Sequence, residues 1–188
     1  MAKKKKANTK KTANKKRAPI RKVALKKTPA ASAVQDKVVR EHLIYLLAGG
    51  GAHADFDAAM GEWPVQLASA KVANFPHTAW MLLEHMRIAQ WDILEFSRNP
   101  RHVSPPWPEG YWPATEAPPS EKAWLDAMGE FKKDLRAVQQ LVGNSKTVLY
   151  RKLPWGDGQT ILREALLVAD HNAYHLGQLV MLRKCMGI

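Results

Sequence analysis

Two histidines four residues apart, His171 and His175, lie within a long apolar helical pattern near the end of the chain. Side chains at positions i and i+4 of an α-helix lie on one face, one turn apart. Both imidazoles can therefore reach a single cation, as the paired histidines of helical zinc sites do. A third histidine, His85, lies in an earlier apolar helical pattern. If the two helices face each other, the three imidazoles form a metal site.

Spacing alone leaves two interpretations of these histidines open. A single inward histidine is usually a core residue that hydrogen-bonds to a neighbour, and three of them could do the same. Burying three unpaired imidazoles is costly, whereas one shared cation satisfies a nitrogen on every ring. Three neutral imidazoles also leave a coordination position for water or substrate, as in catalytic zinc sites. Such an ion would lower the pKa of a bound water, so that metal-bound hydroxide is available near neutral pH.

Two polar residues share the same helical faces as the histidines. Gln178 follows His175 by about one turn, where it can line the site and face a bound substrate. Asp92 belongs to the inward stripe of His85, and we predict a buried salt bridge with an arginine rather than a metal contact. The candidate partners of Asp92 are Arg163 and Arg183.

The remaining histidines and the nearest carboxylates are not predicted to be ligands. Glu84 and Asp170 each adjoin a candidate ligand in sequence, and they therefore point about 100° away from it around the helix. We expect surface or capping roles for the other histidines, and we place His77 in the first turn of the helix predicted over residues 76–98, where it could line the end of the bundle. These residues are His42, His53, His77 and His102.

Four long helices must position the candidate site. Apolar residues at helical spacing predict them over residues 34–48, 76–98, 121–142 and 160–186, with a short helical piece at 54–60. Ser120 is the predicted N-cap of the third long helix, and Asp157 or Thr160 that of the fourth. Four amphipathic helices predict an all-α fold, a four-helix bundle whose inward side chains can build a metal site.

The connection over residues 99–120 is rich in proline and contains Trp107, Tyr111 and Trp112. Connections of this length are often lids or binding loops. We favour a strap whose aromatic side chains pack on the bundle. A polyproline ligand for a partner is less consistent with the aromatic residues, which favour burial.

The net charge of +12 is concentrated at the N-terminus. Residues 1–30 hold 13 of the 29 Lys and Arg residues and no Asp or Glu, so the rest of the chain is nearly neutral. We predict that residues 1–32 are a disordered Lys-rich tail. The tail either attracts nucleic acid without sequence preference or acts as a solubilising linker.

The absence of a signal-peptide pattern and of a long apolar run predicts a cytoplasmic protein that does not enter a membrane. Cys185 is the only cysteine, so no intrachain disulfide can form.

Two segments resemble the DinB-like (DinB/YfiT) superfamily of bacterial four-helix-bundle proteins. They are HTAWMLLEHMRIAQWDIL at residues 77–94 and DHNAYHLGQL at residues 170–179. The resemblance implies an up-up-down-down bundle over residues 33–188 that binds a divalent metal, most often zinc or nickel. It also implies that His85, His171 and His175 are the ligands and that a homodimer can form. Relatives include metal-dependent hydrolases and thiol-dependent transferases that act on small molecules.

The resulting hypothesis is a metalloenzyme in which water or a thiolate substrate is the nucleophile. Hydrolysis uses the ion to activate water, and thiol transfer uses it to stabilise a thiolate. The alternative is a non-catalytic metal-binding or scaffold bundle that associates with nucleic acid through its tail. A third hypothesis is a bundle whose histidines only hydrogen-bond in the core.

Overall fold

The computed structural model describes residues 29–49 and 51–188. Within these residues the regular elements are all helices, apart from one isolated β-bridge between Lys152 and Thr160, so the all-α prediction is confirmed. The helices are α1 (Pro29–Ala48), α2 (Phe56–Met60), α3 (Ala79–Arg98), α4 (Glu121–Gly143) and α5 (Ile161–Met186), with short 3-10 turns at Val65–Leu67 and Glu109–Tyr111.

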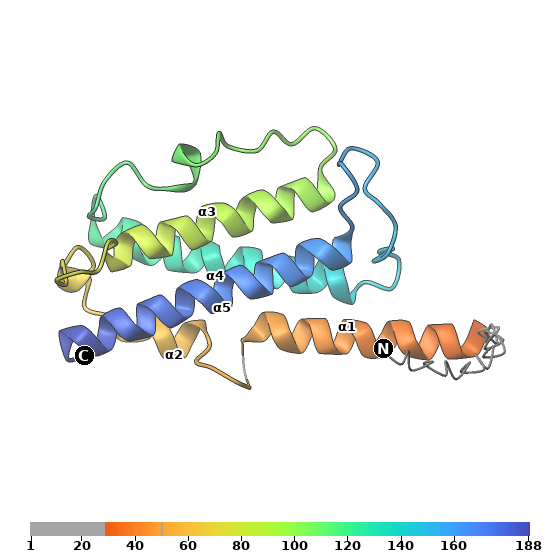
Figure 1. Cartoon of the computed structure of the whole chain (residues 1–188), viewed down its shortest axis with the longest axis horizontal. Helices are drawn as coiled ribbons and strands as arrows, with labels where there is room; N and C mark the ends of the chain where they lie inside the picture. The colour runs from red at the N-terminus through yellow and green to blue at the C-terminus, as the bar shows by residue number, and fades with distance from the viewer. Residues whose placement is uncertain (1–28, 50) are drawn as a thin grey trace, which may run out of the picture.

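The four long helices lie lengthwise beside one another (Figure 1). Helices α3 and α4 run in one direction, and α1 and α5 run in the opposite direction (Figure 1). In chain order the four long helices therefore run down-up-up-down (Figure 1), so the expected up-up-down-down order is wrong: the consecutive parallel helices are α3 and α4. Two parallel helices need a connection that returns along their length, and the segment 99–120 between α3 and α4 provides it (Figure 1).

The N-terminal ends of three helices follow local sequence signals. The hydroxyls of Thr78, Ser120 and Thr160 accept hydrogen bonds from backbone amides in the first turns of α3, α4 and α5. Ser120 and Thr160 were predicted as caps, whereas α3 begins three residues after the expected start at Pro76. Helix α1 begins at Pro29, so residues 29–32 are helical and do not belong to a tail. Proline suits the first helical position, and the alanines that follow favour helix. The other tail residues, 1–28, lie outside the described part of the chain.

The core has two halves that are covered by different helices. Leu43 and Leu47 of α1 pack on one half, together with Val142 and Val168. The other half contains the short α2, whose Phe56 stacks on Phe131 with ring centroids 4.3 Å apart. Helices α1 and α2 thus share one side of the bundle, as Figure 1 shows.

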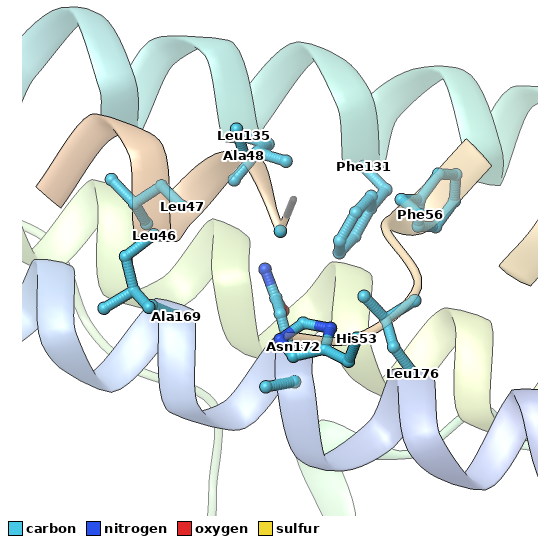
Figure 2. A pocket seen from close by; sticks show the side chains of 12 residues that line it. Leu46, Leu47, Ala48, His53, Phe56, Phe131, Leu135, Ala169, Asn172 and Leu176 are labelled. Atoms are coloured by element: carbon cyan, nitrogen blue, oxygen red, sulfur yellow. The ribbon is translucent and has the colours of Figure 1, made fainter. Parts of the chain in front are cut away.

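A small cavity lies where α1 ends and α2 begins, next to α4 and α5 (Figure 2). Leu46, Phe131 and Asn172 line its walls. Its volume of about 20 Å³ corresponds to roughly one water molecule. The cavity is therefore too small for an organic substrate.

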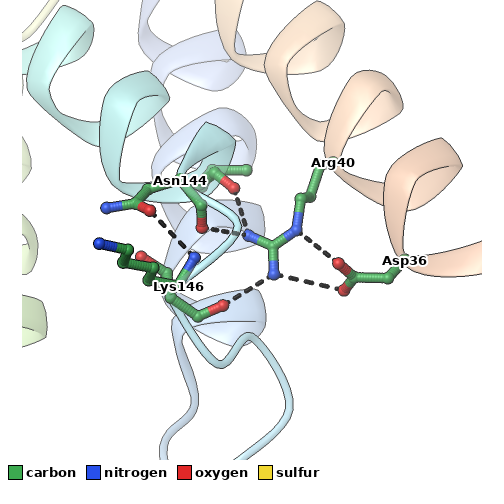
Figure 3. Close-up of polar contacts among 6 residues, drawn as sticks. Asp36, Arg40, Asn144 and Lys146 are labelled. Atoms are coloured by element: carbon green, nitrogen blue, oxygen red, sulfur yellow. Dashed lines mark hydrogen bonds and ion pairs between the residues drawn. The ribbon is translucent and has the colours of Figure 1, made fainter. Parts of the chain in front are cut away.

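A buried arginine fastens α1 to the end of α4 (Figure 3). The guanidinium of Arg40 donates to the backbone carbonyls of Val142, Asn144 and Thr147 at 2.6, 3.0 and 2.7 Å. It also pairs with Asp36, one turn earlier in α1, at 2.7 Å. Because α-helices leave their last carbonyls without intrahelical partners, this side chain completes the C-terminal end of α4 from another helix.

Across the described ranges, no helix has both the length and the apolar character needed to span a bilayer.

Candidate metal centre

Helices α3 and α5 bring the three candidate histidines to one point. One ring nitrogen each from His85, His171 and His175 lies within 4.8 Å of the other two. The Nε2 atoms of His85 and His171 are 3.1 Å apart. His85 and His175 are buried and His171 is partly buried. The two helices therefore place a three-histidine cluster, able to hold a metal ion, inside the bundle.

A chain of side-chain amides aligns the helices around this cluster. Asn172, the neighbour of His171, donates to Oε1 of Gln90 on α3 at 2.8 Å. Gln90 in turn donates to the backbone carbonyl of Phe131 on α4 at 2.7 Å. These buried bonds fix the register of α5 against α3. Sequence reasoning missed both amides, although a glutamine and an asparagine on apolar stripes were a usable signal.

The strap, residues 99–120, orients the His85 ring. The Nδ1 atom of His85 donates to the backbone carbonyl of Tyr111 at 2.9 Å. The indole of Trp112 stacks on the same imidazole, with ring centroids 4.0 Å apart and planes 7° apart. Because a carbonyl only accepts, Nδ1 carries the proton and a neutral His85 presents the lone pair of Nε2 to the cluster.

Gln178 orients the His175 ring in a similar way. The Nδ1 atom of His175 donates to Oε1 of Gln178 at 2.7 Å, so Nε2 of His175 is the atom with a free lone pair. Gln178 was predicted to line the site, and its oxygen contacts a histidine of the cluster directly. The neighbouring Tyr174 is 65% exposed, with its ring 4.8 Å from that of His175.

All three imidazoles are held in the neutral form. Burial first, and then the nearby His175 and His85, lower the pKa of His171 to about 3. Burial lowers the pKa of His175 to about 4. Burial also lowers the pKa of His85, although its hydrogen bond to Tyr111 opposes the change. Neutral imidazole is the form that binds a metal ion.

The spacing of the His85 and His171 nitrogens fits a tetrahedral ion. Two nitrogens bound at about 2.0–2.1 Å to tetrahedral zinc lie about 3.3 Å apart, close to the 3.1 Å between His85 and His171. Two lone pairs cannot face each other at this distance without a proton or a cation between them. Since Nδ1 of His85 is protonated, Nε2 of His171 carries the shared proton when no ion is bound. The residues present therefore fit a divalent metal.

Asp92 is buried as expected, but its predicted salt bridge is wrong. Its carboxylate accepts from the hydroxyl of Tyr111 at 2.6 Å and from Nε2 of His102 at 2.7 Å. The strap brings both donors to α3, closer than any arginine. The two arginines proposed as partners bind elsewhere: Arg163 pairs with Glu164, and Arg183 donates to the carbonyl of Gly61.

Two further histidines, His102 of the strap and His77 just before α3, lie near the site. The side chain of His102 is only 7% exposed and its ring donates to the side chain of Asp92, so the expected surface or capping role is wrong. His77 stacks on Trp112 with ring centroids 4.3 Å apart, but it lies just before α3 and not in its first turn, because the helix begins at Ala79. Glu84 pairs with Arg87 and is not part of the cluster. Sequence reasoning also missed the strap residues that touch His85, because it treated the strap aromatics only as packing.

Comparison of this chain with family models, with curated proteins and with solved structures finds no match.

Proposed function

We propose that this protein is a divalent-metal enzyme of the DinB-like class, a metal-dependent hydrolase or a thiol-dependent transferase. Its four long helices would form the DinB-like bundle, and His85, His171 and His175 would hold zinc or nickel. The observation that carries the proposal is the convergence of three imidazole nitrogens within 4.8 Å, from two facing helices.

The electrostatics of the cluster support a catalytic rather than a purely structural ion. The cluster contains only histidines among the residues described, so no carboxylate neutralises the charge of a bound cation. A divalent ion with three neutral ligands is a strong Lewis acid, which lowers the pKa of a water or thiol that it binds. Three protein ligands also leave a position for that group.

The chain's own residues would orient the reactants. The carbonyl of Tyr111 and the amide of Gln178 engage Nδ1 of His85 and of His175, which leaves the Nε2 lone pair of each ring available to an ion. The exposed ring of Tyr174 beside His175 offers an apolar wall to a small-molecule substrate. Hydrolysis and thiol transfer would use the same site and differ in the nucleophile.

Elemental analysis of the purified full-length protein tests the metal. We expect about one zinc or nickel per chain in the wild type after growth in metal-replete medium, and a near-complete loss in His171→Ala. The matched control is His42→Ala, which removes an exposed histidine of α1. If wild type and His171→Ala are equally metal-free, the proposal is wrong.

A substrate screen separates the two reactions. The metal-loaded protein is incubated with a panel of esters and amides, and separately with thiol cofactors and electrophilic acceptors. Ester or amide cleavage that His175→Ala abolishes assigns the hydrolase, whereas thiol consumption with the same dependence assigns the transferase. Equal rates for wild type and His175→Ala in both panels would contradict the enzymatic proposal.

A further inference from the structure

We infer that Asp92, Tyr111 and His102 form a clasp that sets the metal affinity of the site by positioning His85. The inference rests on the proposed function, because it concerns the same metal site. None of the three side chains belongs to the three-histidine cluster. They are positioning residues, and they act on the ion through the strap.

The clasp is a buried carboxylate with two donors. Asp92 on α3 is 7% exposed, and its two oxygens accept from Tyr111 and His102, at 2.6 and 2.7 Å. Both donors belong to the strap, so one carboxylate fastens two points of it to α3. Burial and the bond to Asp92 raise the pKa of Tyr111 to about 12, which keeps its hydroxyl a donor. A buried carboxylate stripped of these donors would be strongly unfavourable.

The clasp reaches the metal site through the backbone of one residue. Tyr111 binds Asp92 with its hydroxyl and His85 with its carbonyl, which lies 2.9 Å from Nδ1. Trp112, the next residue, stacks on the imidazole. Asp92 follows His85 by seven residues, about 10 Å along the helix axis, so the strap is its route to the ring. The side chain of Tyr111 therefore determines where the acceptor for His85 lies.

A second attachment of the strap provides a comparison. The hydroxyl of Thr78 donates to the carbonyl of Glu116, and Lys71 pairs with the carboxylate of Glu116 at 2.6 Å. This attachment holds the strap five residues beyond Tyr111 and involves no residue of the cluster. If the strap were only packing material, loosening either attachment would have the same effect on the site.

Releasing the clasp should free the His85 ring. Without the Tyr111 carbonyl in place, His85 loses the bond that keeps the proton on Nδ1, and Nε2 is no longer reserved for the ion. Loss of such outer partners typically lowers metal affinity by about 10–100-fold. We expect the Kd for Zn²⁺ to be about 10-fold higher in Tyr111→Phe and in Asp92→Asn than in the wild type. The double variant should bind Zn²⁺ with the same Kd as the single variant of lower affinity, because both substitutions act through the same path.

Zinc titrations against a chromophoric chelator test this on the full-length protein. The variants are Tyr111→Phe, Asp92→Asn and their combination, and the control is Lys71→Ala, which breaks an exposed ion pair of the strap. The control should bind Zn²⁺ as the wild type does. The inference is overturned if Tyr111→Phe, folded by circular dichroism, keeps the wild-type Kd. It is equally overturned if Lys71→Ala weakens Zn²⁺ binding as much as Tyr111→Phe does.

A second measurement on metal-free protein keeps this test separate from the proposed function. Imidazole ¹⁵N chemical shifts report which ring nitrogen carries the proton. We expect the Nδ1–H tautomer of His85 in the wild type and in Lys71→Ala, and a mixture with Nε2–H in Tyr111→Phe. If the wild type binds no Zn²⁺, the proposed function fails while this shift still decides the clasp. An unchanged His85 tautomer in Tyr111→Phe and Asp92→Asn would refute the clasp.

Discussion

The backbone carbonyl of Tyr111 lies 2.9 Å from Nδ1 of His85, so an irregular connection holds a side chain of the three-histidine cluster. Helices alone bring the three histidines together. The strap then engages Nδ1 of His85, and Gln178 engages Nδ1 of His175, so Nε2 is the nitrogen of both rings that keeps a free lone pair. Because a metal needs the lone pair of the correct nitrogen, this orientation matters as much as the convergence of the helices.

Metal binding should stabilise the protein through the histidine cluster. An ion that binds only the folded state contributes about 2.7 kcal/mol at 100 times its Kd, which corresponds to a Tm increase of roughly 5–10 °C for a chain of this size. Differential scanning calorimetry with and without Zn²⁺ measures the increase. His42→Ala should respond as the wild type does, whereas His175→Ala should not respond. An equal response in His175→Ala would place the ion elsewhere.

The metal-free protein should lose stability as the pH falls below about 6.5. The pKa of His171 is about 3 and that of His175 about 4 in the folded state, against an ordinary value of 6.5. The unfolded chain therefore binds more protons between pH 6.5 and 4, and the free energy of unfolding decreases as the pH falls. This contribution is fully present above pH 6.5.

Urea denaturation at several pH values between 7 and 4 measures this dependence. The comparison with His171→Gln isolates the histidine from carboxylates such as Asp134, whose pKa burial raises. The slope of the free energy of unfolding against pH should be shallower in His171→Gln, by an amount that corresponds to up to about one bound proton. Parallel curves for the two proteins would contradict a neutral, buried His171.

The helices and the histidine pair were predictable because their signals are local. His171 and His175 lie four residues apart, and the hydroxyls of Ser120 and Thr160 cap the helices that follow them. The inward position of His85 also followed from helical periodicity. Its meeting with α5 needed only that two apolar faces pack together.

The partners of these residues were not predictable for a physical reason. Asp92 needed buried donors, and the chain offers many, so an arginine was a reasonable but wrong choice. The strap has no periodicity that would reveal which way Tyr111 or His102 points. Its position depends on the completed helix packing, so its contacts with His85 emerge only in the folded structure.

Removing the hydrogen-bond acceptor of His175 should weaken the metal site without unfolding the protein. Gln178→Leu eliminates the oxygen that lies 2.7 Å from Nδ1 of His175, and we expect the Kd for Zn²⁺ to be about 10-fold higher. Gln178→Glu keeps an acceptor at this position and should retain the wild-type affinity or exceed it. Competition titrations with a chelator measure both. Wild-type affinity in Gln178→Leu would show that Gln178 only lines the site.

Arg40 should matter for stability but not for the metal. Its guanidinium satisfies three backbone carbonyls at and just beyond the end of α4 and is 8% exposed, and such a fork of donors has no equivalent in lysine. We expect Arg40→Lys to lower the free energy of unfolding by about 2–3 kcal/mol. The control Arg98→Lys alters a more exposed pair with Glu95 and should change it by less than about 0.5 kcal/mol. Urea denaturation of the metal-free proteins measures both free energies of unfolding. Zn²⁺ titration should give the same Kd for the wild type and the two variants. A stability of Arg40→Lys equal to that of Arg98→Lys would mean that packing alone holds α1 against α4.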